Sequence, residues 1–80
     1  MKLVDNTEEI QKITTAVLIE LVGKEVAANI LPQFLKNRTL TVSCLSLVAA
    51  DTIKTRQHEL VDKINEKLGQ KEVDRIRDLL

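Results

Sequence analysis

Apolar residues recur at helical spacing over the first third of the chain. Intervals of three and four residues, which mark one face of an α-helix, separate Ile10, Ile13, Val17 and Leu21. The pattern predicts a long helix over residues 6–29, because Pro32 cannot continue a helix and disfavours helical geometry at the residue before it. Gly23 lies inside this segment. Glycine costs a helix about 1 kcal/mol relative to alanine, so Gly23 indicates a bend or a close packing contact.

The middle of the chain changes to a period of two. From Thr39 to Cys44, polar and apolar residues alternate, which is typical of a strand with one buried face. Residues 31–36 are also predicted to be extended, and Asn37-Arg38 between the two segments predicts a two-residue hairpin turn. The sequence therefore predicts an antiparallel pair of short strands.

The predicted turn determines which side chains share a face, because each strand alternates. It places Leu35 opposite Leu40, and Phe34 and Thr41 then lie on the outer face. The inner face of the hairpin is predicted to consist of Leu31, Leu35, Leu40, Val42 and Cys44.

A second helix is predicted from Ser46 to Leu68, with Gly69 just past its end in the position that favours a left-handed residue. Its apolar stripe consists of Ala50, Ile53, Leu60, Val61, Ile64 and Leu68. The last segment, 72–80, suits either a helix or a closing strand, and its short length and position favour the strand. Residues 1–80 are thus expected to form one α+β domain, a small two-layer sandwich in the order helix-strand-strand-helix-strand around a three-stranded sheet.

Composition narrows the function. Twelve acidic and twelve basic residues give a formal net charge of zero, whereas a protein that binds nucleic acid through bulk attraction is usually basic. Any nucleic-acid site must therefore be a local patch. No apolar run approaches the roughly 20 residues of a membrane span, and the N-terminus lacks the apolar stretch of a signal peptide. A cytoplasmic protein without membrane contact is expected.

Residues for catalysis or metal binding are scarce. Cys44 is the only cysteine and His58 the only histidine, so neither an internal disulfide nor a cysteine-based zinc cluster can form. Cys44 is predicted to be a core residue and His58 an exposed helical one. No phosphate-binding glycine motif occurs. We therefore predict a binding protein that is not an enzyme and that has no cofactor and no bound metal.

Two features are candidates for binding. Arg56, Lys63 and Lys67 gather along one flank of the second predicted helix. They either form a rim that shields the edge of the core, with Glu59 and Glu66 beside them, or contact phosphates or an acidic partner. A terminal strand with outward-pointing Arg75 and Arg77 would enlarge this patch.

Phe34 is the second candidate and the only aromatic residue of the chain. It either packs beneath the N-terminal helix or anchors a partner or a homodimer. The zero net charge is compatible with a protein-interaction or homodimerising module that has no nucleic-acid role.

The chain resembles the DciA family of bacterial replicative-helicase loaders over about four-fifths of its length. The likeness lies in LVGKEVA over residues 21–27, Pro32, LKN over 35–37 and LTV over 40–42. It continues through ELVDKINEKLG over residues 59–69 and closes with Val73 and the RIR of 75–77. Where family members usually have tryptophans, this chain has Leu18 and, near the second position, Ala49.

The resemblance implies a KH-like fold with a three-stranded sheet covered by helices, and it favours a strand for the last segment. It also implies binding to a DnaB-type helicase and weak contact with single-stranded DNA, in support of helicase recruitment or loading, without enzymatic activity. The GxxG loop of RNA-binding KH domains is absent.

Overall fold

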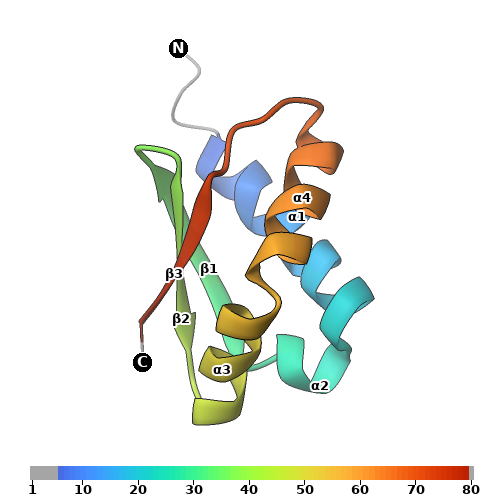
Figure 1. Cartoon of the computed structure of the whole chain (residues 1–80), viewed down its shortest axis with the longest axis vertical. Helices are drawn as coiled ribbons and strands as arrows, with labels where there is room; N and C mark the ends of the chain where they lie inside the picture. The colour runs from blue at the N-terminus through green and yellow to red at the C-terminus, as the bar shows by residue number, and fades with distance from the viewer. Residues whose placement is uncertain (1–5, 80) are drawn as a thin grey trace.

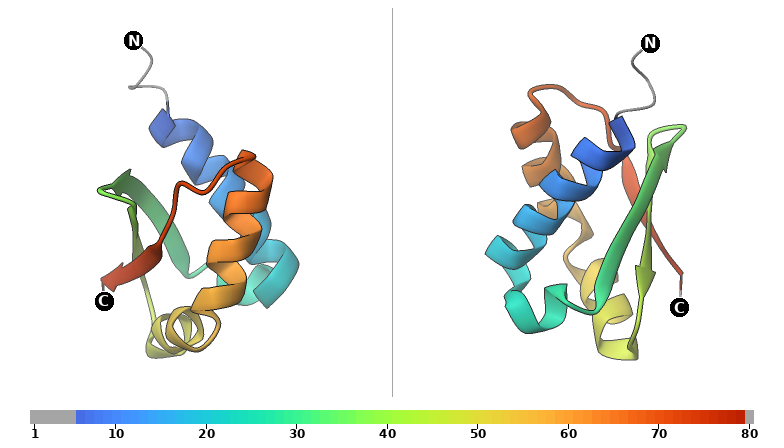
Figure 2. Two further views of the ribbon diagram at one scale, coloured as in Figure 1. Left: turned by 45° about the horizontal axis from the view of Figure 1, so that its top comes forward. Right: turned by 180° about the vertical axis from the view of Figure 1, so that it is seen from behind.

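The computed structural model describes residues 6–79, which form four helices and three strands within that range. Their order along the chain is α1 (Asn6–Val22), α2 (Lys24–Ala27), β1 (Ile30–Lys36), β2 (Thr39–Cys44), α3 (Leu47–Thr55), α4 (Gln57–Leu68) and β3 (Arg75–Leu79). The helices lie on one side of the sheet and leave its other side open (Figures 1 and 2). The predicted α+β class, the order of elements and the terminal strand are confirmed.

The three strands form a mixed sheet in the order β1-β2-β3. β1 and β2 are antiparallel, and β2 and β3 are parallel, because α3 and α4 return the chain to the start of β2 before β3 begins. The predicted hairpin register is confirmed, with Leu35 opposite Leu40. Asn37 and Arg38 both have positive φ, 52° and 63°, as the central residues of a type I′ turn require.

Side chains outside the hairpin hold this turn in place. Arg38 Nε donates to Asp74 Oδ2 (2.9 Å) and its Nη2 donates to the Lys71 carbonyl (2.9 Å). The Asp74 N–H donates in return to the Arg38 carbonyl (2.8 Å). These bonds offset the cost of a left-handed conformation at a residue other than glycine or asparagine, and they join the turn to the segment that leads into β3.

The prediction that Leu31 lies on the inner face is wrong. The register of β1 shifts between Pro32 and Phe34, so that Ile30 rather than Leu31 pairs with Cys44. Such a β-bulge reverses the alternation of the residues before it. Ile30 is buried and Leu31 is exposed. Gln11 of α1 stabilises the bulge, since its Nε2 donates to the carbonyls of Pro32 (3.2 Å) and Gln33 (2.9 Å).

Both predicted long helices are interrupted. Gly23, with φ of 93°, separates α1 from α2, in agreement with the predicted bend. The second helix was predicted to be continuous, and this is wrong, because Arg56 (φ −111°, ψ 21°) separates α3 from α4. The hydroxyls of Thr52 and Thr55 donate to the carbonyls of the residues four positions earlier, and such bonds bend helices.

The core lies between the helices and the inner face of the sheet. Val17 and Leu18 of α1, Leu60 and Ile64 of α4, and Leu40 of β2 are all less than 2% exposed. The sequence patterns predicted Cys44 as a core residue, and it is buried. Gly69 ends α4 in the predicted left-handed conformation (φ 84°).

Asn65 fixes the loop between α4 and β3. Its Oδ1 accepts hydrogen bonds from the N–H groups of Glu72 and Val73 (2.9 and 2.8 Å), and its Nδ2 donates to the Val73 carbonyl (2.9 Å). Val73 is fully buried beside it. The start of β3 is therefore held at a defined place beside β2.

Candidate functional site

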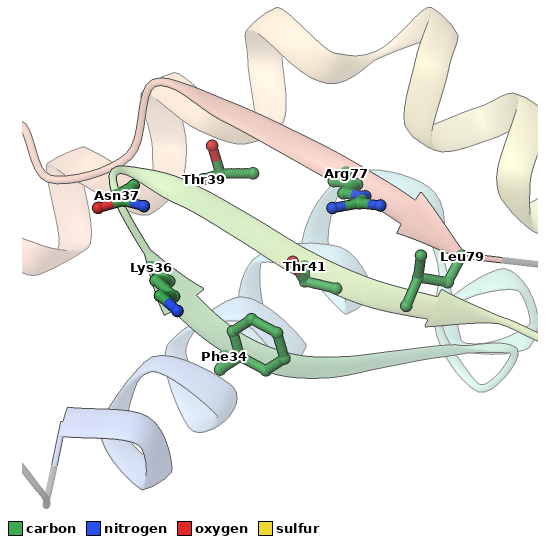
Figure 3. A pocket seen from close by; sticks show the side chains of 7 residues that line it. All are labelled: Phe34, Lys36, Asn37, Thr39, Thr41, Arg77 and Leu79. Atoms are coloured by element: carbon green, nitrogen blue, oxygen red, sulfur yellow. The ribbon is translucent and has the colours of Figure 1, made fainter.

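The outer side of the sheet presents three rows of side chains, which we call the open face. The strand register defines the rows, because paired residues of neighbouring strands point to the same side. From one end of the sheet to the other, the rows are Lys36-Thr39-Arg75, Phe34-Thr41-Arg77 and Leu31-Ser43-Leu79. Figure 3 shows Phe34, Thr41 and Arg77 side by side on this face.

Phe34 lies in the middle row of the open face, on the edge strand β1, and is 47% exposed. Thr41 between Phe34 and Arg77 is only 5% exposed, so the two larger side chains flank it. Together with residues at the hairpin turn they line a shallow hollow of about 450 Å³. The prediction that Phe34 lies on the outer face is confirmed, and packing beneath the N-terminal helix is excluded.

The open face is basic. Lys36, Arg75 and Arg77 contribute three cations, and none of the nine positions carries a carboxylate. Asp78 lies between Arg77 and Leu79, but strand alternation turns it to the helix-covered side. No ion pair found among residues 6–79 involves the three cations. A chain with no net charge thus has a local excess of positive charge.

Arg38 lies next to this face and forms an ion pair with Asp74. The hydrogen bond to Asp74, followed by attraction to the negative charge of Asp74, raises the pKa of the Arg38 guanidinium. The same hydrogen bond is the main cause that lowers the pKa of the Asp74 carboxyl. Arg38 therefore supports the turn, and Lys36, Arg75 and Arg77 are the cations that face solvent.

The predicted flank of Arg56, Lys63 and Lys67 lies on the other side of the sheet, where α4 packs on α1. There, Lys63 Nζ is 3.7 Å from Glu20 Oε2, and Lys67 Nζ is 4.0 Å from Glu20 Oε1. Lys63 is also 3.6 Å from Glu66. We call these cations and their partners the helical charge cluster.

Arg56 belongs to the same cluster and has a structural contact in addition. Its Nε donates to Glu59 Oε1 (2.7 Å), and its Nη1 donates to the Leu21 carbonyl (2.7 Å) at the end of α1. The bond to Glu59 is the main cause that raises the pKa of Arg56 and lowers the pKa of Glu59. Arg56 thereby connects the break between α3 and α4 to α1.

The five predicted cations are therefore not one patch. Arg75 and Arg77 join Phe34 on the open face, while the other three belong to the helical charge cluster. Lys36 also lies on the open face, although it was not among the predicted candidates. The signal was present, because Lys36 lies two residues after Phe34 in the same strand and shares its face by alternation.

The remaining candidate groups have ordinary surroundings. Cys44 is 4% exposed, and burial is the main cause that raises the pKa of its thiol, which opposes formation of the nucleophilic thiolate. His58 is exposed on α4. Over residues 6–79, no three histidine, cysteine or acidic side chains gather in an arrangement able to hold a metal ion, and no helix is long and apolar enough to span a bilayer.

The fold defines a small α+β domain with one helix-covered and one open sheet face. Within that class, the chain belongs to the DciA family, because the family model described as Dna[CI] antecedent, DciA, matches residues 5–77. This family comprises non-enzymatic loaders of the replicative helicase, and membership associates the chain with DNA replication. A search of curated proteins finds no match.

Proposed function

We propose that this chain assists the recruitment or loading of a DnaB-type replicative helicase in the bacterial cytoplasm and contacts single-stranded DNA weakly through the open face. It acts by binding, without catalysis and without a cofactor. Family membership supports the helicase partner. The observation that carries the DNA contact is that three cations and an exposed aromatic ring share the open face, none of whose nine positions carries a carboxylate.

The chemistry of the open face suits a single strand better than a duplex. Unpaired bases stack on aromatic side chains, and cations beside them follow the phosphates. Phe34 offers one stacking position, with Lys36 two residues further along β1 and Arg77 across Thr41 in the same row.

The small number of cations predicts a weak and salt-sensitive contact. Each neutralised phosphate of a single strand contributes about −0.7 to the slope of log K against log salt concentration. Three contacts give a slope of about −2, so affinity should fall roughly 20-fold between 50 and 200 mM salt.

Fluorescence anisotropy with a labelled oligothymidylate at these two salt concentrations tests the DNA contact. The double variant Lys36→Ala, Arg77→Ala should lose most of the affinity at 50 mM salt. The matched double variant Lys63→Ala, Lys67→Ala removes two cations from the helical charge cluster and should bind as the wild type does. Absence of binding at 50 mM salt, or equal losses in both variants, would refute the open face as the DNA site.

The helicase partner requires a separate measurement. The chain immobilised on a biosensor should bind a purified DnaB-type helicase from the same organism, in the absence of DNA, and should not bind an unrelated hexameric ATPase. If the helicase does not bind at micromolar concentration, the loading role is refuted even where the DNA contact holds.

A further inference from the structure

A second exposed surface lies at one end of the molecule, where β2 leads into α3. Leu45, Leu47 and Val48 are 61%, 74% and 66% exposed. Leu31 and Leu79 are 45% and 42% exposed and lie on either side of Ser43 in the last row of the open face. Ser43 precedes Leu45 by two residues in the chain. We call these five residues the apolar end, which is the lower end in Figure 1.

The helical phase of α3 keeps this surface exposed. Ser46 caps the helix, since its side-chain oxygen accepts a hydrogen bond from the Ala49 N–H (3.1 Å). From that start, Ala49, Ala50 and Ile53 turn toward the core, and Leu47 and Val48 necessarily face away from it. Two large apolar residues thus occupy the solvent side of a short helix, where polar residues are usual.

The size of the apolar end can be compared with what a dimer needs. Complete burial of a leucine-sized side chain removes about 100 Å² of apolar surface, so these five side chains expose about 300 Å². Two copies would bury about 600 Å² of apolar surface together, and at the roughly 65% apolar share of homodimer contacts the interface would cover about 900 Å². That area is below the roughly 1,200 Å² of stable complexes and fits a weak, concentration-dependent dimer.

The charges around the apolar end fit a second copy better than DNA or lipid. Asp51 lies one helical turn beyond Leu47 and is exposed, and Arg77 is exposed two residues before Leu79. In a two-fold interface, Arg77 of each copy can contact Asp51 of the other, so the contact occurs twice. A rim that carries both positive and negative charges can therefore be complementary to itself. A surface for phosphates or anionic lipid would need a cluster of cations. Zero net charge also avoids long-range repulsion between copies.

We propose that the apolar end is a self-association surface that binds a second copy of this chain across a two-fold axis. The proposal uses Leu45, Leu47 and Val48 as the centre of the contact. It does not rest on the proposed function, because neither DNA nor helicase takes part, although Arg77 belongs both to the rim of this contact and to the open face. Phe34 and Lys36, at the other rows of the open face, stay outside the centre of the contact.

Sedimentation velocity on the full chain from 10 µM to 1 mM tests this proposal. The weight-average mass should rise with concentration toward that of a dimer. The double variant Leu47→Glu, Val48→Glu should lower the association constant at least tenfold, because it buries four carboxylates in each dimer. Ile19→Glu is the matched control, since Ile19 is 44% exposed on α1, and it should associate as the wild type does.

Thermal unfolding verifies that each variant is folded, and Leu47→Gln, Val48→Thr is a milder pair with the same expected direction. A wild-type chain that remains monomeric at 1 mM overturns the proposal. So does a dimer that persists in both double variants. A dimer that Phe34→Ala abolishes and Leu47→Glu, Val48→Glu does not would place the interface on the open face instead, and overturns it as well.

Discussion

The open face and the helical charge cluster each contain three cations, but only those of the helical charge cluster lie beside carboxylates. Lys36, Arg75 and Arg77 share the open face with no carboxylate. In the helical charge cluster, Glu20, Glu59 and Glu66 lie within 4.0 Å of Arg56, Lys63 or Lys67. The two surfaces would look alike if only basic residues were considered.

The comparison shows that the position of the acids determines which cations are available. An exposed ion pair contributes little to stability. Its acid nevertheless cancels much of the attraction that the cation would exert on a phosphate. On the open face the field of three like charges adds up, since nothing opposite in sign lies among them. A protein with no net charge can therefore present a basic surface when its acids are concentrated on other elements.

The largest expected effect comes from removing the aromatic side chain of the open face. Phe34→Ala should weaken binding of single-stranded DNA by about 1–3 kcal/mol, because a base loses its stacking partner. Stability should change by less than about 1 kcal/mol, since Phe34 is half exposed. Anisotropy titration and chemical denaturation measure the two effects. Phe34→Trp retains a stacking surface and should bind at least as well as the wild type; equal losses in both variants would contradict stacking.

The helical charge cluster should respond in the opposite way. Arg56→Ala should lower the free energy of unfolding, and by more than Lys54→Ala does, because the bond from its guanidinium to the Leu21 carbonyl is lost. DNA affinity should stay unchanged. Lys54→Ala removes an exposed cation from the neighbouring α3 and should shift stability by less than about 0.5 kcal/mol. A loss of DNA affinity without a loss of stability in Arg56→Ala would reverse the roles assigned to the two surfaces.

Adding a carboxylate to the open face should make it resemble the helical charge cluster. Thr39 lies between Lys36 and Arg75, and Thr39→Glu should weaken DNA binding roughly eightfold at 50 mM salt, the contribution of about one phosphate contact. Thr39→Gln separates the effect of size from that of charge. Thr55→Glu makes the same change at an exposed position outside the open face and should have less effect. Similar titration curves for the two glutamate variants would count against a local site.

The smallest effect should come from removing an acid that two lysines share. Glu20→Gln removes the carboxylate beside Lys63 and Lys67 and should raise DNA affinity a few-fold at low salt, because both ammonium groups become available. Glu66 remains next to Lys63 and limits the gain. Anisotropy titration at 50 mM salt measures it, with the exposed Glu25→Gln on α2 as control. An unchanged affinity would mean that pairing with acids does not decide which cations contact DNA.

The regular parts of the fold could be predicted because local patterns determine them. The period of two over residues 39–44 predicted β2, and the two-residue turn predicted the pairing of Leu35 with Leu40. The break at Arg56 and the exposure of Leu31 could not be predicted in the same way. The exposure of Leu31 depends on a contact distant in sequence, the support of the β1 bulge by Gln11. At the break, the distant bond from Arg56 to the Leu21 carbonyl adds to the local bonds of Thr52 and Thr55.

The candidate site was predictable in part for a related reason. Alternation placed Phe34 on the outer face, and the same alternation extends to Lys36. Assigning Arg75 and Arg77 to that face, and not to the flank of α4, required knowing that β3 pairs with β2 and that the helices cover only the inner side. β2 and β3 pair in parallel although α3 and α4 lie between them in the chain, and no local sequence pattern indicates such a pairing.

The position of β3 also has a consequence for the order of folding. Residues 45–74 separate β3 from the strand it pairs with, whereas β1 and β2 are joined by two residues. Closing the longer loop costs more chain entropy before any contact forms, so the hairpin is expected to form early and β3 to dock late. Two of the three cations on the open face arrive with that strand. A nascent or partly opened chain would therefore have the aromatic residue but not most of the charge, and would acquire affinity for phosphate only in its final step of folding.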